Sequence, residues 1–412
     1  MHRRACLLLA ALTVSSAAFA DPIKILFVGN SYTFGRVDPV MSYNAANVHD
    51  LTAAFNAISS AGANPWEPHP WGGVPGIFKM FTDESGLSYD VSISARNAAT
   101  LRGQFLNTAN AAWDLRGNVA SQVWNTVVLQ EQSDAALPAG RGKNANLAQF
   151  NAYADQFERF IHNGAAQTYT EAQLYGSLAA CQATGASTTT CNTVRNIPQN
   201  VNASAATKVY LTDTWARPDM VFAHKITTPD ATTPDGRPIV DTSSAGGDAT
   251  LYYSALAEMT ADLHASFAAK AASNLRFAGV IPVGDAFQLA VDQGLVKTGG
   301  FYDANGVYVP EQAGEAMNLW WYDYLHASKY GSYLDALVQF GTITGLDPLS
   351  LGADEQAAKD LGISSADALT LQRIASQGLA VAAVPEPETW ALLTAGLLLI
   401  ARRAHRRAGA RR

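Results

Sequence analysis

Short apolar runs alternate along the chain with longer segments in which apolar residues recur every three to four positions. The short runs are rich in β-branched residues, which predicts buried strands at 23–28, 89–94, 126–130, 208–212 and 276–283. The longer segments predict helices at 40–60, 72–81, 146–162, 254–272 and 286–293. Strands that alternate with helices form parallel sheets covered on both faces. We therefore expect an α/β fold, a flavodoxin-like three-layer sandwich with a central parallel sheet of about five strands.

Two segments interrupt this alternation and are expected to be loop excursions. Residues 163–205 are low in charge and rich in Thr, Ala and Asn, and residues 225–249 hold three Pro and a Gly-Gly pair. Both lie within one main domain, predicted at 21–345. Residues 346–383 are expected to form a small helical appendix and linker.

Both ends of the chain look like targeting segments. Residues 1–20 join Arg3 and Arg4 to an apolar run that ends in small residues, the pattern of a secretory signal peptide, although a buried helix is the alternative. Residues 384–412 begin with Pro-Glu-Pro and end in clustered arginines. The apolar stretch between them, 390–400, is shorter than the ~20 residues of a transmembrane helix.

This tail closely resembles the PEP-CTERM sorting signal of Gram-negative bacteria, which an exosortase recognises. The resemblance implies an exosortase-type partner and a transient or anchored contact of residues 390–400 with the inner membrane. A plain C-terminal anchor is the alternative. Under both interpretations the protein is exported from the cytoplasm and is periplasmic, at the cell surface or extracellular.

Charge and cysteine content narrow the choice of partners. The chain has 28 basic and 35 acidic residues, and the two ends hold eight of the arginines but only two of the acids. We therefore expect no binding of nucleic acid through bulk charge. Cys6 leaves with the signal peptide, and Cys181 and Cys191 are expected to form a local disulfide in an oxidising compartment.

No cofactor or metal is expected. The chain has neither a P-loop nor a dinucleotide fingerprint, and no His or further Cys flanks the cysteine pair. Five histidines between the two end segments share no spacing typical of metal ligands, and they are His49, His69, His162, His224 and His264.

Two separate motifs suggest nucleophilic chemistry. Ser31 follows the first predicted strand in Gly29-Asn30-Ser31, where its hydroxyl can project from the edge of the sheet. A serine nucleophile needs a base, a residue that orients the base, and donors for the oxyanion. Asp323-Tyr324-Leu325-His326 offers a carboxylate and an imidazole three residues apart. Each motif alone has a simpler interpretation, a turn serine and a packed histidine.

Together these motifs resemble those of the SGNH, or GDSL-type, hydrolase family, over roughly residues 23–340. The Gly-Asn-Ser-Tyr-Thr segment looks like a subgroup of that family. The resemblance implies that Ser31 is the nucleophile, His326 the general base and Asp323 the residue that orients His326. It also implies an oxyanion hole to which the Ser31 N–H contributes.

Two blocks depart from the family pattern. The family's Gly-x-Asn-Asp block is replaced by Gln-Glu-Gln-Ser, so Gln132 is our candidate for the oxyanion amide. The family's glycine after the second strand is replaced as well. We assign its backbone donor to Ala98, with Asn97 as the competing donor. Asn30, Asn97 and Trp215 are weaker candidates for substrate binding, and packing explains Trp215 equally well.

We therefore expect an exported serine esterase that works through an acyl-enzyme. The sorting tail resembles those of exopolysaccharide-producing bacteria, which suggests deacetylation or other deacylation of an extracellular glycan. Two alternatives stay open. One is a non-catalytic, glycan-binding surface or matrix protein on the same scaffold, and the other is an acyltransferase that uses the same triad.

Overall fold

Strand β1 lies inside a six-stranded parallel sheet with the order β2-β3-β1-β4-β7-β8. The computed structural model describes residues 21–36, 38–54, 67–109, 112, 114–222, 250–299 and 316–382. The strands are β1 (Ile23–Gly29), β2 (His49–Asp50), β3 (Tyr89–Ala95), β4 (Thr126–Gln130), β7 (Lys208–Thr212) and β8 (Phe277–Ile281). The predicted α/β class is confirmed, with six strands in place of about five.

The additional strand, β2, shows why the count differed. It has only two residues, both polar, and it lies at the edge of the sheet beside β3. A strand this short has no hydrophobic periodicity to detect. The helix predicted at 40–60 is wrong over residues 40–53, because Ala45–Asn47 form one 3-10 turn that leads into β2. Residues 55–60 of that prediction lie outside the described residues.

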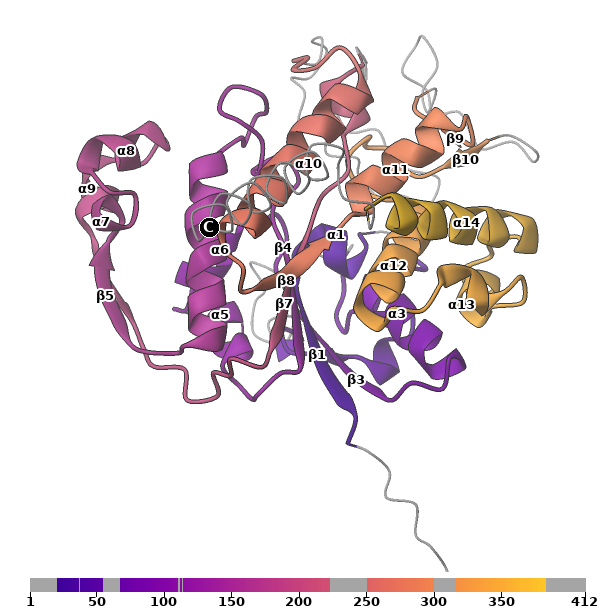
Figure 1. The fold of residues 1–412 in the computed structure, drawn as a ribbon, viewed down its shortest axis with the longest axis horizontal. Coiled ribbons are helices and arrows are strands. Elements are labelled where there is room, and N and C mark those ends of the chain that lie inside the picture. Colours follow the sequence, from indigo (N-terminus) through magenta and orange to yellow (C-terminus); the bar gives the residue numbers. More distant parts are fainter. Residues whose placement is uncertain are drawn as a thin grey trace, which may run out of the picture.

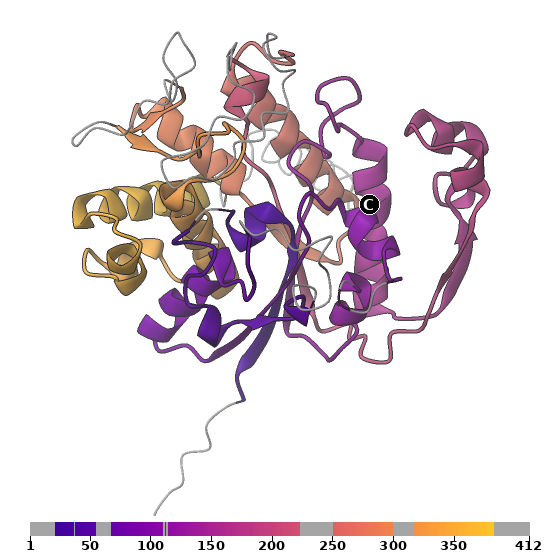
Figure 2. The same cartoon turned by 180° about the vertical axis from the view of Figure 1, so that it is seen from behind.

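Helices cover both faces of the sheet (Figures 1 and 2). On one face α6 and α10 touch through Phe150 and Phe267, whose ring centroids are 4.7 Å apart. On the other face α3 and α12 meet through Phe81 and Tyr333, with centroids 5.4 Å apart. Outside residues 163–205, the described helices are α1 (Ser31–Phe34), α3 (Gly73–Glu84), α4 (Leu101–Leu106), α5 (Leu115–Val119), α6 (Leu147–His162), α10 (Leu256–Ser273), α11 (Val283–Asp292), α12 (Lys329–Thr344), α13 (Gln356–Asp360) and α14 (Ser365–Ala382).

The segment after α12 is helical, and it packs on the main body. Its elements are a 3-10 turn (Pro348–Leu351), α13 and α14. Leu371 and Ile374 of α14 are fully buried and belong to the same hydrophobic core as the sheet. Two further short strands, β9 (Val296–Lys297) and β10 (Met317–Asn318), pair with each other before α12.

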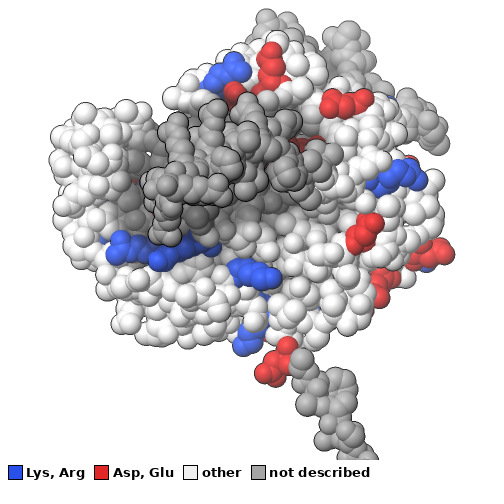
Figure 3. Space-filling view, viewed as in Figure 1, with Lys and Arg blue, Asp and Glu red and all other residues white. Residues whose placement is uncertain are grey.

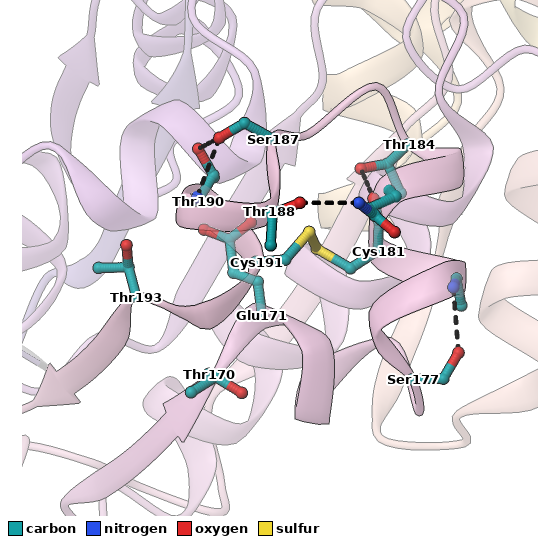
Figure 4. Close-up of a disulfide and its surroundings, with 12 residues drawn as sticks. Thr170, Glu171, Ser177, Cys181, Thr184, Ser187, Thr188, Thr190, Cys191 and Thr193 are labelled. Atoms are coloured by element: carbon teal, nitrogen blue, oxygen red, sulfur yellow. Dashed lines mark hydrogen bonds between the residues drawn. A yellow bond between two sulfur atoms is a disulfide. The ribbon is translucent and has the colours of Figure 1, made fainter.

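The excursion predicted at 163–205 contains an arm with its own secondary structure (Figure 1). Strands β5 (Gln167–Thr170) and β6 (Val194–Ile197) pair antiparallel, and three short helices lie between them. These helices are α7 (Glu171–Leu174), α8 (Leu178–Ala183) and α9 (Thr188–Asn192). The expected disulfide is confirmed, because Cys181 of α8 and Cys191 of α9 are bonded with a Cα–Cα distance of 5.9 Å (Figure 4).

Replacing Cys181 and Cys191 with Ser is expected to destabilise the arm by about 2–3 kcal/mol, because the closed loop then regains chain entropy in the unfolded state. The body should keep its main unfolding transition, since its core contacts do not depend on this bond. Limited proteolysis should therefore cut the variant within 171–194 before the body. Dithiothreitol should reproduce this on the wild type and leave the variant unchanged. Equal cleavage rates with and without the bond would contradict the prediction.

Several sequence-based expectations fall outside the described residues. They are the signal peptide at 1–20, the loop at 225–249, and the tail from 383 onward. None of the helices in the described part of the chain is long and apolar enough to cross a membrane. On the face shown in Figure 3, acidic and basic side chains are scattered and most of the surface is uncharged.

Candidate active site

Ser31 is the first residue of α1, and Asn30, the N-cap of that helix, separates it from the end of β1. The turn that presents it is fixed by Gln130 at the end of β4, whose Oε1 accepts hydrogen bonds from Asn30 N and Thr33 Oγ1, both at 3.1 Å. Gly29 is required here, because a Cβ at this position would lie 1.9 Å from Thr33 Oγ1. The serine is thus held by a tightly packed strand-to-helix turn.

Asn30 fastens this turn to the neighbouring loops. Its Nδ2 donates to Ala99 O at 3.1 Å and to Glu131 O at 3.4 Å, and its Oδ1 accepts from Tyr32 N at 3.1 Å. The side chain is buried, and all of these partners are backbone atoms. The structure thus gives Asn30, a weaker sequence candidate for substrate binding, a framework position.

The Asp323–His326 segment lies between β10 and α12, and it folds so that the carboxylate meets the imidazole. Asp323 Oδ1 accepts from Leu325 N at 3.0 Å and His326 N at 2.9 Å, while Oδ2 is 2.5 Å from His326 Nδ1. Tyr324 adopts a positive φ of 57°, which closes this turn. His326 Nε2 is 2.8 Å from Ser31 Oγ. Residues 295 positions apart therefore form one continuous hydrogen-bonded line.

Burial strengthens the electrostatic interactions between Ser31, His326 and Asp323. Ser31 is 5% exposed and His326 is 4% exposed. Burial alone would raise the pKa of Asp323, but the charge and hydrogen bonds of His326, with a contribution from Arg36, bring that pKa down to about 2. Asp323 is therefore ionised at any physiological pH and can stabilise a protonated His326.

Tyr32 and Trp215 fix the position of the backbone next to His326. Tyr32 Oη and Trp215 Nε1 each donate to Leu325 O, both at 3.0 Å. Their rings stack with centroids 3.9 Å apart, and the Phe287 ring stacks on Trp215 with centroids 4.8 Å apart. Trp215 is only 2% exposed, so its side chain supports the residue next to His326 and has little surface for a substrate.

The oxyanion donors predicted from the sequence follow neighbouring strands. Ala98 lies in an exposed turn after β3 with a positive φ of 55°. Neither the Ala98 N–H nor the Ser31 N–H donates to another described residue. The Asn30 bond to Ala99 O fastens the Ala98 turn beside the serine. Both backbone donors are thus open, and Asn97 is exposed next to them.

Gln132, the third expected donor, is half-buried after β4. Its Nε2 donates to Ser133 Oγ at 3.0 Å, and its Oε1 accepts from Asp134 N at 3.4 Å. The amide is therefore bonded to its own loop, and it would have to rotate to reach an oxyanion.

Sequence reasoning assigned no role to Glu131, which ties the two donor loops together. Its Oε1 accepts from Leu101 N at 2.9 Å and from Gln132 N at 2.7 Å, so it joins the loop after β3 to the loop after β4. Burial raises the pKa of Glu131 to about 7, although the two N–H donors oppose this shift. The sequence did contain one indication of this role, because Glu131 is an acidic residue directly after the fully buried strand β4.

Replacing Glu131 with Gln is expected to stabilise the protein at pH 8 by up to about 3 kcal/mol and to change little at pH 5. A carboxyl whose pKa is raised by folding destabilises the fold once pH climbs through its folded value, here about 7. Gln keeps an oxygen acceptor without the charge. Urea denaturation at both pH values measures the difference. The exposed Glu84→Gln serves as control, and the same pH response in both variants would contradict the prediction.

A buried ionic cluster lies under the loops after β4 and β7. Arg217 donates to both carboxylate oxygens of Asp219 at 2.9 and 2.5 Å, to Ser133 Oγ at 3.0 Å and to Asp134 Oδ1 at 3.3 Å. Burial lowers the pKa of Arg217, but the two carboxylates outweigh it and raise that pKa overall. The guanidinium is neutralised by its own neighbours, so it braces the loops and is not an open site for anions.

Comparison with known proteins finds distantly similar structures for the body of the chain and a specific match for its C-terminal tail. No curated protein matches the sequence. Similar solved structures include a protein from Slackia heliotrinireducens provisionally assigned to the SGNH hydrolases, at 16% identity and a TM-score of 0.32, over 78% of this chain and 100% of that one. Another is a DUF4886 family protein from Bacteroides uniformis, at 11% identity and a TM-score of 0.41, over 90% of this chain and 99% of that one.

At these TM-scores the likeness carries no argument about activity, which has to be derived from the site. The tail is different, because the PEP-CTERM protein-sorting motif matches residues 383–407 and confirms the resemblance seen in the sequence. Such a motif implies recognition by exosortase-type machinery. Residues 383–407 therefore carry a PEP-CTERM protein-sorting motif, which indicates export and sorting to the cell envelope.

Proposed function

We propose that the protein is an exported serine esterase that hydrolyses acyl esters through an acyl-enzyme. The observation that carries the proposal is the line of hydrogen bonds from Ser31 Oγ to His326 Nε2 at 2.8 Å and from His326 Nδ1 to Asp323 Oδ2 at 2.5 Å. A nucleophile that is hydrogen-bonded to a base, which is in turn hydrogen-bonded to an orienting carboxylate, is the arrangement that serine acyl transfer requires. The likeness to SGNH hydrolases is not needed for this argument.

In the first half of the reaction, Ser31 Oγ attacks the carbonyl carbon while His326 Nε2 takes the hydroxyl proton. Asp323 stabilises the resulting imidazolium, and the Ser31 and Ala98 N–H groups hold the oxyanion. His326 then gives its proton to the leaving alcohol as the carbon–oxygen bond breaks. Water repeats the sequence on the acyl-enzyme and releases the acid and free Ser31.

For the substrate class, we propose O-acyl groups, acetyl in the first instance, on an extracellular glycan. The support is the sorting motif, which takes the protein to the envelope where such glycans lie. Acetate release from an O-acetylated polysaccharide, compared with the same polymer after chemical deacetylation, measures this activity. Rapid cleavage of long acyl esters without any acetate release would contradict the substrate class and leave the esterase proposal standing.

Labelling with a fluorophosphonate probe, mapped by mass spectrometry, tests the proposal. The probe should modify Ser31 in the folded protein, and the label should disappear in Ser31→Ala but persist in Ser121→Ala, which removes an exposed serine hydroxyl. Glycan binding without any labelling would favour a non-catalytic matrix protein. The Gln132 amide, which is bonded to its own loop, is the observation in favour of that alternative.

An acyltransferase would give the same labelling, so a second measurement separates it from a hydrolase. The products from an acyl ester donor are compared with and without a glycan acceptor. Free acid at an unchanged yield supports hydrolysis. Acyl groups that move onto the glycan hydroxyls in place of free acid would make transfer the reaction.

A further inference from the structure

Asp213, His264 and Asp285 come together at the edge of the sheet although they belong to three separate elements. Asp213 directly follows β7, His264 lies in α10, and Asp285 is in the first turn of α11. One ligand atom from each of the three lies within 4.8 Å of the others. His264 Nδ1 is 2.8 Å from Asp285 Oδ2. The proposed esterase reaction uses none of these side chains.

The charge balance of this cluster is unusual. Asp213 is 2% exposed, and no Lys or Arg of the described chain forms an ion pair with it. Its Oδ1 accepts a hydrogen bond from Gly284 N at 2.8 Å. Burial of the Asp213 carboxylate and its repulsion from the Asp285 carboxylate both disfavour two negative charges in this cluster. A cation held between the two carboxylates would offset both effects.

The backbone around Asp213 sets the direction of its carboxylate. Gly284 approaches the end of β7 so closely that a Cβ on it would lie 2.3 Å from Thr214 O. Only glycine allows this approach, and the approach brings the Gly284 N–H onto Asp213 Oδ1. A hydrogen bond that orients a carboxylate is a common feature of the second shell around metal ligands.

We propose that Asp213, His264 and Asp285 bind one divalent transition-metal cation, with Zn²⁺ as the first choice. Imidazole nitrogen and carboxylate oxygen are both ligands of Zn²⁺, and three protein ligands leave a position for water. The imidazole disfavours the hard cations Ca²⁺ and Mg²⁺, which take oxygen ligands. The three ligands come from a strand end and two helices, so the bound ion joins α10 and α11 to the end of β7.

The proposed metal site is connected to the candidate active site by the short segment of backbone that follows Asp213. Two residues after Asp213 comes Trp215, which donates to Leu325 O beside His326. An ion at the end of β7 therefore stabilises the segment that supports the histidine. It does not touch the reacting atoms, so its role is structural.

The test titrates the full chain, purified without a polyhistidine tag and stripped with a chelator, with ZnCl₂ in a calorimeter at pH 7. One saturable site per chain and a rise in Tm on adding Zn²⁺ are expected. His264→Ala and Asp285→Asn, at positions open to solvent, should each weaken binding by about tenfold or more. Acidification to pH 5 should weaken it too, because protons compete for the imidazole and carboxylates.

His49→Ala is the matched control. His49 is an exposed histidine beside one carboxylate, with Nε2 3.0 Å from Asp90 Oδ1, and it belongs to no metal-like group of the described residues. It should bind Zn²⁺ as the wild type does. Ser31→Ala should also bind normally, so failure of the esterase proposal would leave this site standing.

Three results would overturn the metal site. They are the absence of saturable binding to the full chain, equal Zn²⁺ affinity in His264→Ala and the wild type, and tighter binding of Ca²⁺ than of Zn²⁺. If His264 and Asp285 were only an ion pair, His264→Ala would change Tm by the same amount with and without Zn²⁺.

Discussion

Replacing Ser31 with Ala is expected to lower kcat for hydrolysis of p-nitrophenyl acetate by about 10⁴-fold to 10⁶-fold. The loss is this large because the serine oxygen is the atom that forms the acyl-enzyme, and among the described residues His326 Nε2, 2.8 Å away, bonds to no other hydroxyl that it could activate. Ser31 is small and buried, so Ala should fit without repacking. The measurement is kcat and KM for both proteins, with Tm to verify folding.

Substitution of His326 is a second, independent test of the same reaction step. His326→Ala should lose about as much activity as Ser31→Ala, and the double variant should lose no more than either, because nucleophile and base act as one unit. Ser121→Ala should keep the wild-type rate. A Ser31→Ala protein that is folded and fully active would remove the nucleophile assignment. Additive losses in the double variant would place the two residues in separate steps.

The parts of the site that were predictable from sequence are those in which one short motif contains the chemistry. Ser31 follows a run of buried apolar residues, so both the strand and the position of Ser31 beyond its carboxyl end could be inferred. Asp323 and His326 are three residues apart, and the turn between them brings carboxylate and imidazole together. That the two motifs lie 2.8 Å apart rested on the family resemblance, since no local pattern encodes it.

What escaped prediction depends on partners that are distant in the sequence. Tyr32 and Trp215 both donate to Leu325 O, across separations of 293 and 110 residues. The cluster of Asp213, His264 and Asp285 likewise joins a strand end to two helices, so no ligand spacing was visible in the sequence. Pairing of this kind is set by the order of strands in the sheet.

Secondary structure was predictable where burial imposes a regular pattern of apolar residues on the sequence. It was not predictable where such a pattern is absent. The buried residues of β1 and β4 form continuous apolar runs, which is typical of strands covered on both faces. The two polar residues of β2 form no such run. In the arm, short helices are started by Thr170, Ser177 and Ser187, whose side chains cap the first turns, so a segment rich in Thr and Ser was mistaken for a loop.

Replacing Asp323 with Asn is expected to lower kcat by about 10⁴-fold with a much smaller change in KM. The carboxylate uses Oδ1 for Leu325 N and His326 N, and Oδ2 for His326 Nδ1. Asn keeps the first contact but turns an NH₂ group toward Nδ1, which must then become an acceptor. The proton moves to Nε2, and the ring can no longer take the proton of Ser31.

The same change has a stability signature that separates it from simple misfolding. Folding lowers the pKa of Asp323 to about 2, so its ionised form adds stability above the unfolded pKa, and this stability disappears as pH falls toward 2. Asp323→Asn should therefore be less stable than the wild type at pH 7 by about 2 kcal/mol, with the gap closing between pH 4 and pH 2. Urea denaturation over this range measures the gap, with the exposed Asp354→Asn as control. A gap that stays constant with pH, or a loss of activity confined to KM, would contradict the role of Asp323 as the ionised partner of His326.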